Sequence, residues 1–147
     1  MTPRQRVVTA LNHQELFDCV KSRSRGRIVQ HSCGSVYRLL PEMVEAGVEV
    51  LNPVQASAAH MHRRRLKAQF GDRLSFMGGI DTQRVLPFGT PDDVRREVKR
   101  RISDLVPGGG YILAPVHNVQ AEVPPENLVT MYRHALQVGC NPLQMAG

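Results

Sequence analysis

The feature that most constrains the fold of this chain is a regular alternation of short apolar runs with longer amphipathic segments. Four such runs occur in 147 residues, and each is followed by a segment with helical spacing of its apolar positions. The four runs are 27–31, 48–51, 74–77 and 111–114. Strands that alternate with helices pair in parallel, because the helix carries the chain back to the start of the next strand. The sequence therefore predicts an α/β fold.

The segments between the runs carry helix signals. Helices are expected over 35–46, 58–70, 90–105 and 124–138, and two more, over 4–11 and 15–23, precede the first strand. The strongest start is Thr90-Pro91-Asp92-Asp93, which combines a capping hydroxyl, a proline in the first turn and two carboxylates that suit the helix dipole. We therefore expect about four parallel strand–helix units preceded by N-terminal helices.

The chain is basic, with 19 Lys and Arg against 13 Asp and Glu and a formal charge of +6. Such a charge attracts anionic substrates or nucleic acid. The basic residues fall into three separate stretches, 21–27, 63–67 and 95–101, and the last two follow helical spacing. The middle stretch has no interleaved aromatic residue of the kind that stacks on bases. We therefore expect solvated helix faces and no nucleic-acid partner.

The cysteines and the apolar runs bear on the redox state of the thiols, on membrane association and on the location of the protein. Cys19, Cys33 and Cys140 are odd in number and widely spaced, which argues against a disulfide framework. No apolar run approaches the roughly 18 to 20 residues that span a bilayer, and the start lacks the apolar core of a secretory signal. The expectation is free thiols, no membrane association and a cytoplasmic location.

Polar residues gather where the predicted strands end, which is where parallel α/β proteins place functional groups. The four strand ends are 31–34, 52–55, 78–81 and 117–120. His31 and Cys33 are the most informative pair, because residues two apart in an extended chain point the same way. A thiolate and an imidazole suit zinc. A purely structural role explains a His-x-Cys pair equally well.

A third ligand and several substrate contacts are predicted at the other strand ends. His117 stands at the fourth end, and catalytic zinc usually has three protein ligands. Gln55, Asp81 and Asn118 are the candidate substrate-binding residues. Each has a structural alternative: Asp81 follows a Gly-Gly turn and suits a turn or helix cap, and the two amides suit loop backbone groups.

Several short motifs follow one another along the chain: HSCG at 31–34, EVLNPVQ at 49–55, LKAQFG at 66–71, GGID at 78–81, LPFGTP at 86–91, APVH at 114–117 and PPEN at 124–127. In this order they resemble the uroporphyrinogen decarboxylase family, and in particular its methyltransferase-like branch. Residues 1–15 are similar to the family's opening, and residues 16–138 resemble its C-terminal half. The chain is accordingly divided into an N-terminal helix, 1–15, and the C-terminal half of a barrel, 16–147.

This resemblance implies a partial (β/α)8 TIM barrel and a zinc site. In the cobamide-dependent branch, a His-x-Cys pair and a later Cys bind zinc, which activates a thiol to accept a methyl group from methylcobamide. His31 and Cys33 match the first two ligands, and His117 stands where the third, a cysteine, is expected. The family's decarboxylases also carry a histidine here, lining the porphyrinogen pocket, but their arginine-rich motif and catalytic aspartate are not matched.

Three functions follow from this reading. The first is zinc-dependent methyl transfer between a corrinoid and a small-molecule thiol, with a corrinoid protein as partner. The second is a carboxy-lyase of tetrapyrrole biosynthesis, and the third is a non-catalytic fragment. A closed barrel needs about 250 residues, so we expect an internally shortened chain. Its two open sheet edges would favour pairing with a second copy.

Overall fold

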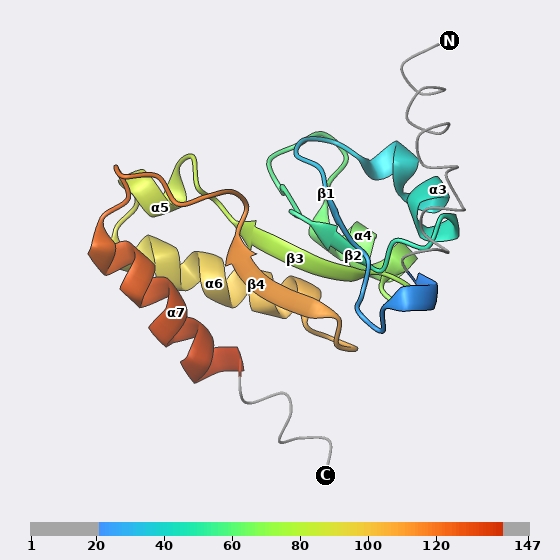
Figure 1. The fold of residues 1–147 in the computed structure, drawn as a ribbon. Coiled ribbons are helices and arrows are strands. Elements are labelled where there is room, and N and C mark those ends of the chain that lie inside the picture. Colours follow the sequence, from blue (N-terminus) through green and yellow to red (C-terminus); the bar gives the residue numbers. More distant parts are fainter. Residues whose placement is uncertain (1–20, 140–147) are drawn as a thin grey trace.

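The computed structural model describes residues 21–139, which form four strand–helix units around one sheet (Figure 1). The helix predicted over 4–11 lies outside the described residues, and so does most of the one over 15–23, of which residues 21–23 are helical. The strands are β1 (Val29–His31), β2 (Val50–Asn52), β3 (Ser75–Ile80) and β4 (Tyr111–Pro115). They lie in the order β1-β2-β3-β4, and every neighbouring pair is parallel. The predicted α/β class is confirmed.

Helices connect each strand to the next, and a last helix follows β4. They are η1 (Tyr37–Leu39), α3 (Leu40–Glu45), α4 (Arg63–Phe70), α5 (Val85–Phe88), α6 (Pro91–Leu105) and α7 (Pro125–Gly139). The start of α6 has the predicted form: the Thr90 hydroxyl accepts from the backbone N–H of Asp93, and the Asp93 carboxylate accepts from the backbone N–H of Thr90. This reciprocal pair satisfies two donors that the first turn of a helix would otherwise leave open.

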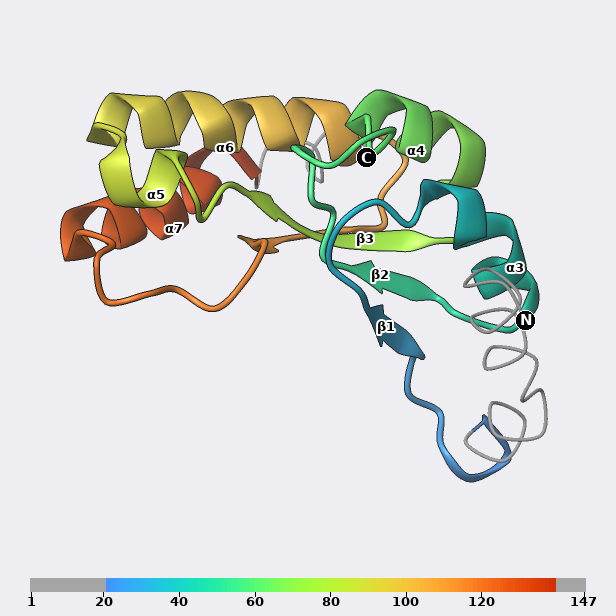
Figure 2. The ribbon, with the colours of Figure 1, turned by 90° about the horizontal axis from the view of Figure 1, so that it is seen from above.

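The two faces of the sheet differ. Leu51, Phe76 and Tyr111 are in register across β2, β3 and β4, and the first two are fully buried. Figure 2 shows α4 and α6 running along one face of this sheet. Side chains alternate between faces along a strand, so Val29 and Ile112 belong to the opposite face, where they are 53% and 49% exposed.

Two hydrophobic clusters hold the layers together. The first joins β2, β3, α3 and α4 through residues such as Leu40, Met61 and Leu66, all fully buried. The second packs α5, α6 and α7 against the end of β3, with Ile80 and Met131 fully buried. Apolar burial of this kind is the main stabilising term in folding. The clusters cover the helical side of the sheet and fix the strands whose carboxyl ends carry the candidate site.

Three boundaries differ from those predicted. The helix expected over 58–70 begins only at Arg63, because His60 has φ 64°, which an α-helix does not tolerate. The helix expected over 35–46 starts as the short 3-10 turn η1. Strand β3 continues through Gly78 and Gly79, which pair with Leu113 and Ala114 although the Gly-Gly pair suggested a turn.

The architecture is a partial (β/α)8 barrel that is open on both sides. The outer strands of the sheet are β1 and β4, and each pairs with only one neighbour within residues 21–139. Four strands cannot close a barrel of eight. Over the same residues the structure contains no helix of the length and apolar character needed to cross a membrane.

Candidate metal site at the carboxyl ends of the strands

His31 and Cys33 come together at the end of β1. The Sγ atom of Cys33 lies 3.5 Å from Nε2 of His31, and both side chains are exposed. Two ligands of one tetrahedral zinc, at Zn–S and Zn–N distances of about 2.3 and 2.0 Å, stand about 3.5 Å apart. The spacing between the imidazole and the thiol therefore already fits a shared zinc ion.

The loop that carries Cys33 is held on both sides of this residue. The backbone N–H of Ser32 donates to the carbonyl of Asn52, at 2.8 Å. The backbone N–H of Gly34 donates to Oε1 of Gln55, also at 2.8 Å. Gly34 has φ +83°, a conformation that glycine adopts without steric cost. One acceptor is the last residue of β2 and the other lies in the loop after it, so the second strand–loop unit holds the first.

His117 reaches the same rim from β4. The backbone N–H of Val116 donates to the carbonyl of Ile80 at 2.9 Å, which continues the β3–β4 pairing to the residue before His117. The His117 ring stands edge-on to that of His31, with 6.4 Å between ring centroids. Two imidazoles on one tetrahedral zinc have centroids about 5 Å apart. Among residues 21–139, no three His, Cys, Asp or Glu side chains stand as a ready-made ligand set. The His117 ring must therefore approach by about 1 Å to complete one.

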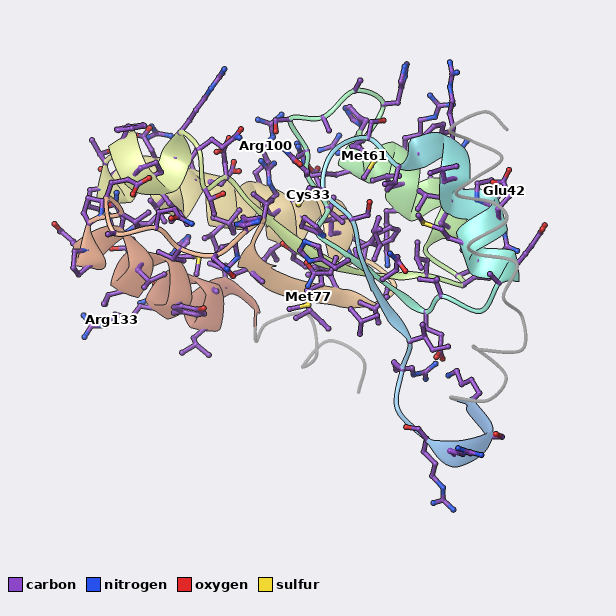
Figure 3. All side chains as sticks on the ribbon, turned by 45° about the horizontal axis from the view of Figure 1, so that its top comes forward. Cys33, Glu42, Met61, Met77, Arg100 and Arg133 are labelled. Atoms are coloured by element: carbon purple, nitrogen blue, oxygen red, sulfur yellow. The ribbon has the colours of Figure 1, made fainter. Side chains whose placement is uncertain are left out.

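A hollow of about 340 Å³ opens beside the two histidines. It is lined by His31, Asn52, Met77, Pro115, Val116, His117 and Asn118. The Asn52 amide donates to Sδ of Met77 at 3.2 Å, so these two side chains are fixed against each other. Figure 3 shows Cys33 and Met77 near the middle of the molecule. Met77 was not predicted as a lining residue, although its place in β3, at the end of an apolar run, is a signal for it.

The three predicted substrate-binding residues occupy different places. Asn118 lines the hollow beside His117, where its side chain is exposed. Gln55 lies under the Cys33 loop and accepts its hydrogen bond from Gly34. Asp81 caps a turn, since its Oδ1 accepts from the backbone N–H groups of Gln83 and Arg84 at 2.7 and 2.8 Å. A substrate contact for any of the three stays a prediction.

A buried charged network supports β3 from the helical side. Arg101 donates through Nε to the carbonyl of Gly79 at 2.6 Å and forms an ion pair with Glu97. Tyr111 donates its hydroxyl to the carbonyl of Gly78 at 2.7 Å. Burial lowers the pKa of the Arg101 guanidinium, an effect that Glu97 opposes, and burial raises the pKa of the Tyr111 hydroxyl. These contacts fix the strand end next to the hollow.

The apolar spacing of α6 is a sequence signal for a buried Arg101. Val94, Val98, Arg101 and Leu105 recur at helical spacing along α6, and all four are buried. An arginine on the apolar face of a helix indicates a buried polar partner. A second pair joins α6 to α4: burial alone would raise the pKa of the Asp104 carboxyl, but hydrogen bonds from Arg64 and Arg63 lower it below its usual value.

Known proteins resemble this chain over different lengths. A curated uroporphyrinogen decarboxylase from Alkalilimnicola ehrlichii is 31% identical over 61 residues, which are 42% of this chain and 16% of that protein. A solved methyltransferase from Methanosarcina mazei has a TM-score of 0.70 at 24% identity, and the match covers 93% of this chain and 38% of that one. The chain thus spans well under half the length of either relative, and the second match supports the fold.

The family itself rests on a longer match. The model of the uroporphyrinogen decarboxylase (URO-D) family matches residues 5–137, which is most of the 147-residue chain. The four parallel strands and their helices, apart from the last two residues of α7, lie within that range, and so do the strand ends that carry His31, Cys33 and His117. The chain belongs to the uroporphyrinogen decarboxylase family.

Proposed function

We propose that this chain carries the zinc-binding half of a methyltransferase-like member of its family, with His31, Cys33 and His117 as ligands. The observation that carries the proposal is the 3.5 Å distance between Nε2 of His31 and Sγ of Cys33, with the His117 ring on the same rim. A thiolate and two imidazoles are ligands that zinc accepts readily. The hollow lined by His31 and His117 would leave room for a substrate beside the metal.

Bound at this place, zinc would lower the pKa of a coordinated thiol and so supply a thiolate that accepts a methyl group from a corrinoid. The residues of the chain would bind and orient the substrate. Asn52 and Asn118 line the hollow and offer amide groups for hydrogen bonds to a polar small molecule. The formal charge of +6 favours an anionic thiol or cofactor. The methyl donor would arrive on a corrinoid protein.

A second candidate function is a carboxy-lyase acting on a tetrapyrrole without zinc. The name of the curated relative from Alkalilimnicola ehrlichii favours it, and so does the histidine at 117, which faces the hollow. In this case His117 and basic side chains would hold the propionate groups of the substrate. Tetrapyrrole binding by metal-free protein, unaffected by Cys33→Ser, would support this function over the first.

A third reading is that the chain has no activity of its own. Within residues 21–139, four strand ends contribute to the rim, and a catalytic site tolerates displacements of only about 0.5 Å. A second copy that pairs with the open edges of β1 and β4 would complete the rim, and we propose this association as the condition for activity. Turnover by a protein that stays monomeric at assay concentration would contradict that condition.

Metal analysis of purified protein tests the zinc proposal. We expect about one zinc per chain in the wild type and a large loss in Cys33→Ser, because serine offers no thiolate. Cys140→Ser is the matched control, since Cys140 has no predicted ligand role, and it should retain its zinc. Equal zinc content in the wild type and in Cys33→Ser would contradict the proposal.

A further inference from the structure

The contact between Gln55 and Gly34 links two segments that lie far apart in the sequence. Oε1 of Gln55 accepts from the backbone N–H of Gly34 across 21 positions, in a partly buried setting. Gly34 directly follows Cys33, so this bond acts on the residue next to the thiol. The other bond to this loop, from Ser32 to Asn52, continues the β1–β2 pairing and would form with any side chain at position 52.

Gln55 is itself held in place by the central strand. Val54, its neighbour, is fully buried, and its backbone N–H donates to the carbonyl of Met77 at 2.8 Å. The backbone carbonyl of Gln55 accepts from Ala58 at 3.0 Å. Pro53 approaches Gly78 so closely that a Cβ on that glycine would lie 3.0 Å from Cβ of Pro53. The backbone at 53–55 therefore has little freedom to shift.

These contacts form a continuous route from β3 to the thiol. The carbonyl of Met77 in β3 accepts from the backbone N–H of Val54, which holds the backbone from which the Gln55 side chain extends. The Gln55 side chain in turn accepts from the backbone N–H of Gly34. Groups that orient a metal ligand, without touching the metal, typically change affinity by about 10- to 100-fold when removed. A bond on the residue next to Cys33 belongs to this class.

We propose that Gln55 is a positioning residue that sets the place of the Cys33 thiol relative to the His31 imidazole. This inference rests on the proposed zinc site and adds to it a residue that does not contact the metal. Its role is to accept the hydrogen bond from the backbone N–H of Gly34. A side chain of similar length with an acceptor oxygen can therefore replace it, and an apolar side chain cannot. The effect should be specific to the Cys33 loop.

Three variants separate this role from general stability. Gln55→Leu keeps the size of the side chain and removes the acceptor, while Gln55→Glu keeps an acceptor of the same length. The control is Gln69→Leu: Gln69 also accepts a hydrogen bond through Oε1, from the Tyr37 hydroxyl at 2.5 Å, but it lies on α4. Zinc affinity is measured by competition with a chelator, and exchange of the Gly34 amide hydrogen is measured in metal-free protein.

We expect Gln55→Leu to lose about 10- to 100-fold in zinc affinity and to speed exchange at Gly34. Gln55→Glu should restore most of the affinity, and Gln69→Leu should match the wild type. Equal zinc affinity in the wild type and Gln55→Leu would overturn the positioning role. If the wild type binds no zinc, the proposed function fails separately. Exchange at Gly34 then decides: faster exchange in Gln55→Leu supports the role, and unchanged exchange refutes it.

Discussion

The two loops that supply the candidate ligands are built differently. Residues 31–34 are held by hydrogen bonds on both sides of Cys33, from Ser32 to Asn52 and from Gly34 to Gln55. Residues 117–122 are all exposed. One backbone bond, from Val116 to Ile80, fixes the entrance of this second loop, and another, from Val123 to Gln120, closes its far end.

The distances at the rim divide in the same way. Nε2 of His31 and Sγ of Cys33 are already 3.5 Å apart, close to the separation of two ligand atoms on one zinc. The ring centroids of His31 and His117 are 6.4 Å apart, which exceeds the separation of about 5 Å for two imidazoles on one zinc. In the proposed zinc site, His31 and Cys33 would be arranged in advance, and His117 would be brought in when the metal binds. Preorganised groups bind more tightly because less ordering is needed on binding.

The largest expected effects on zinc affinity come from two single variants, each of which removes one proposed ligand from one of the loops. Cys33→Ser should weaken zinc binding by more than the roughly 100-fold that the loss of an outer group causes, because it destroys the arranged pair. His117→Ala should cost less than Cys33→Ser, because the pair of His31 and Cys33 survives. Both affinities are measured by chelator competition at one pH. A larger loss in His117→Ala than in Cys33→Ser would reverse the comparison.

A methyl group at Gly78 tests whether β3 positions the held loop. Gly78 has φ +106°, and an added Cβ would lie 3.0 Å from Cβ of Pro53. Gly78→Ala should therefore destabilise the fold by about 1–3 kcal/mol and also weaken zinc binding through the displaced 53–55 segment. Chemical denaturation and zinc titration measure the two effects.

The control for Gly78→Ala is Gly47→Ala. Gly47 has a similar φ of +96°, but an added Cβ would meet no atom within 4 Å. In this variant, backbone strain should lower the free energy of unfolding, and zinc affinity should be unchanged. If both glycine variants keep the wild-type zinc affinity, the contact of β3 with residues 53–55 does not help to position the proposed ligands.

The smallest effect concerns the chain that enters β1. Hydrogen bonds from the Lys21 side chain and the Ile28 backbone, with a contribution from Arg27, lower the pKa of Glu49 from 4.5 to about 2. A lowered pKa means that this stabilisation is complete above pH 4.5 and is lost as the pH falls toward 2. We expect the melting temperature to fall over that window, and to fall less steeply in Glu49→Gln.

Glu122→Gln provides the comparison for the Glu49 variant, because Glu122 is exposed on the second loop. It should leave the pH dependence of the melting temperature unchanged. Identical curves for Glu49→Gln and the wild type between pH 2 and 4.5 would show that Glu49 does not stabilise the entry to β1.

Much of the fold could be predicted because it depends on local patterns. The four apolar runs marked the four strands, and Thr90-Pro91-Asp92-Asp93 marked the start of α6, where capping is decided within one turn. Boundaries failed where a distant contact overrides local preference. The Gly78-Gly79 pair suggested a turn, yet it pairs with β4 because the ladder continues on that side.

The candidate site was predictable only in part. The His31-x-Cys33 spacing was enough to predict the two side chains as a pair, because residues two apart in an extended chain point the same way. The hydrogen bond from Gly34 to Gln55 joins residues 21 positions apart, and that from Asn52 to Met77 joins residues 25 positions apart. No local pattern encodes which side-chain oxygen or sulfur such a donor will meet. Register between strands decides it, and the sequence does not state the register.

X-ray absorption at the zinc edge of zinc-loaded protein is the most direct test of the central claim. We expect one sulfur at about 2.3 Å and two imidazole nitrogens at about 2.0 Å from the metal, with the sulfur signal lost in Cys33→Ser and one nitrogen lost in His117→Ala. A spectrum with no sulfur neighbour in the wild type, or with the same nitrogen count in His117→Ala, would contradict a shared site at this rim.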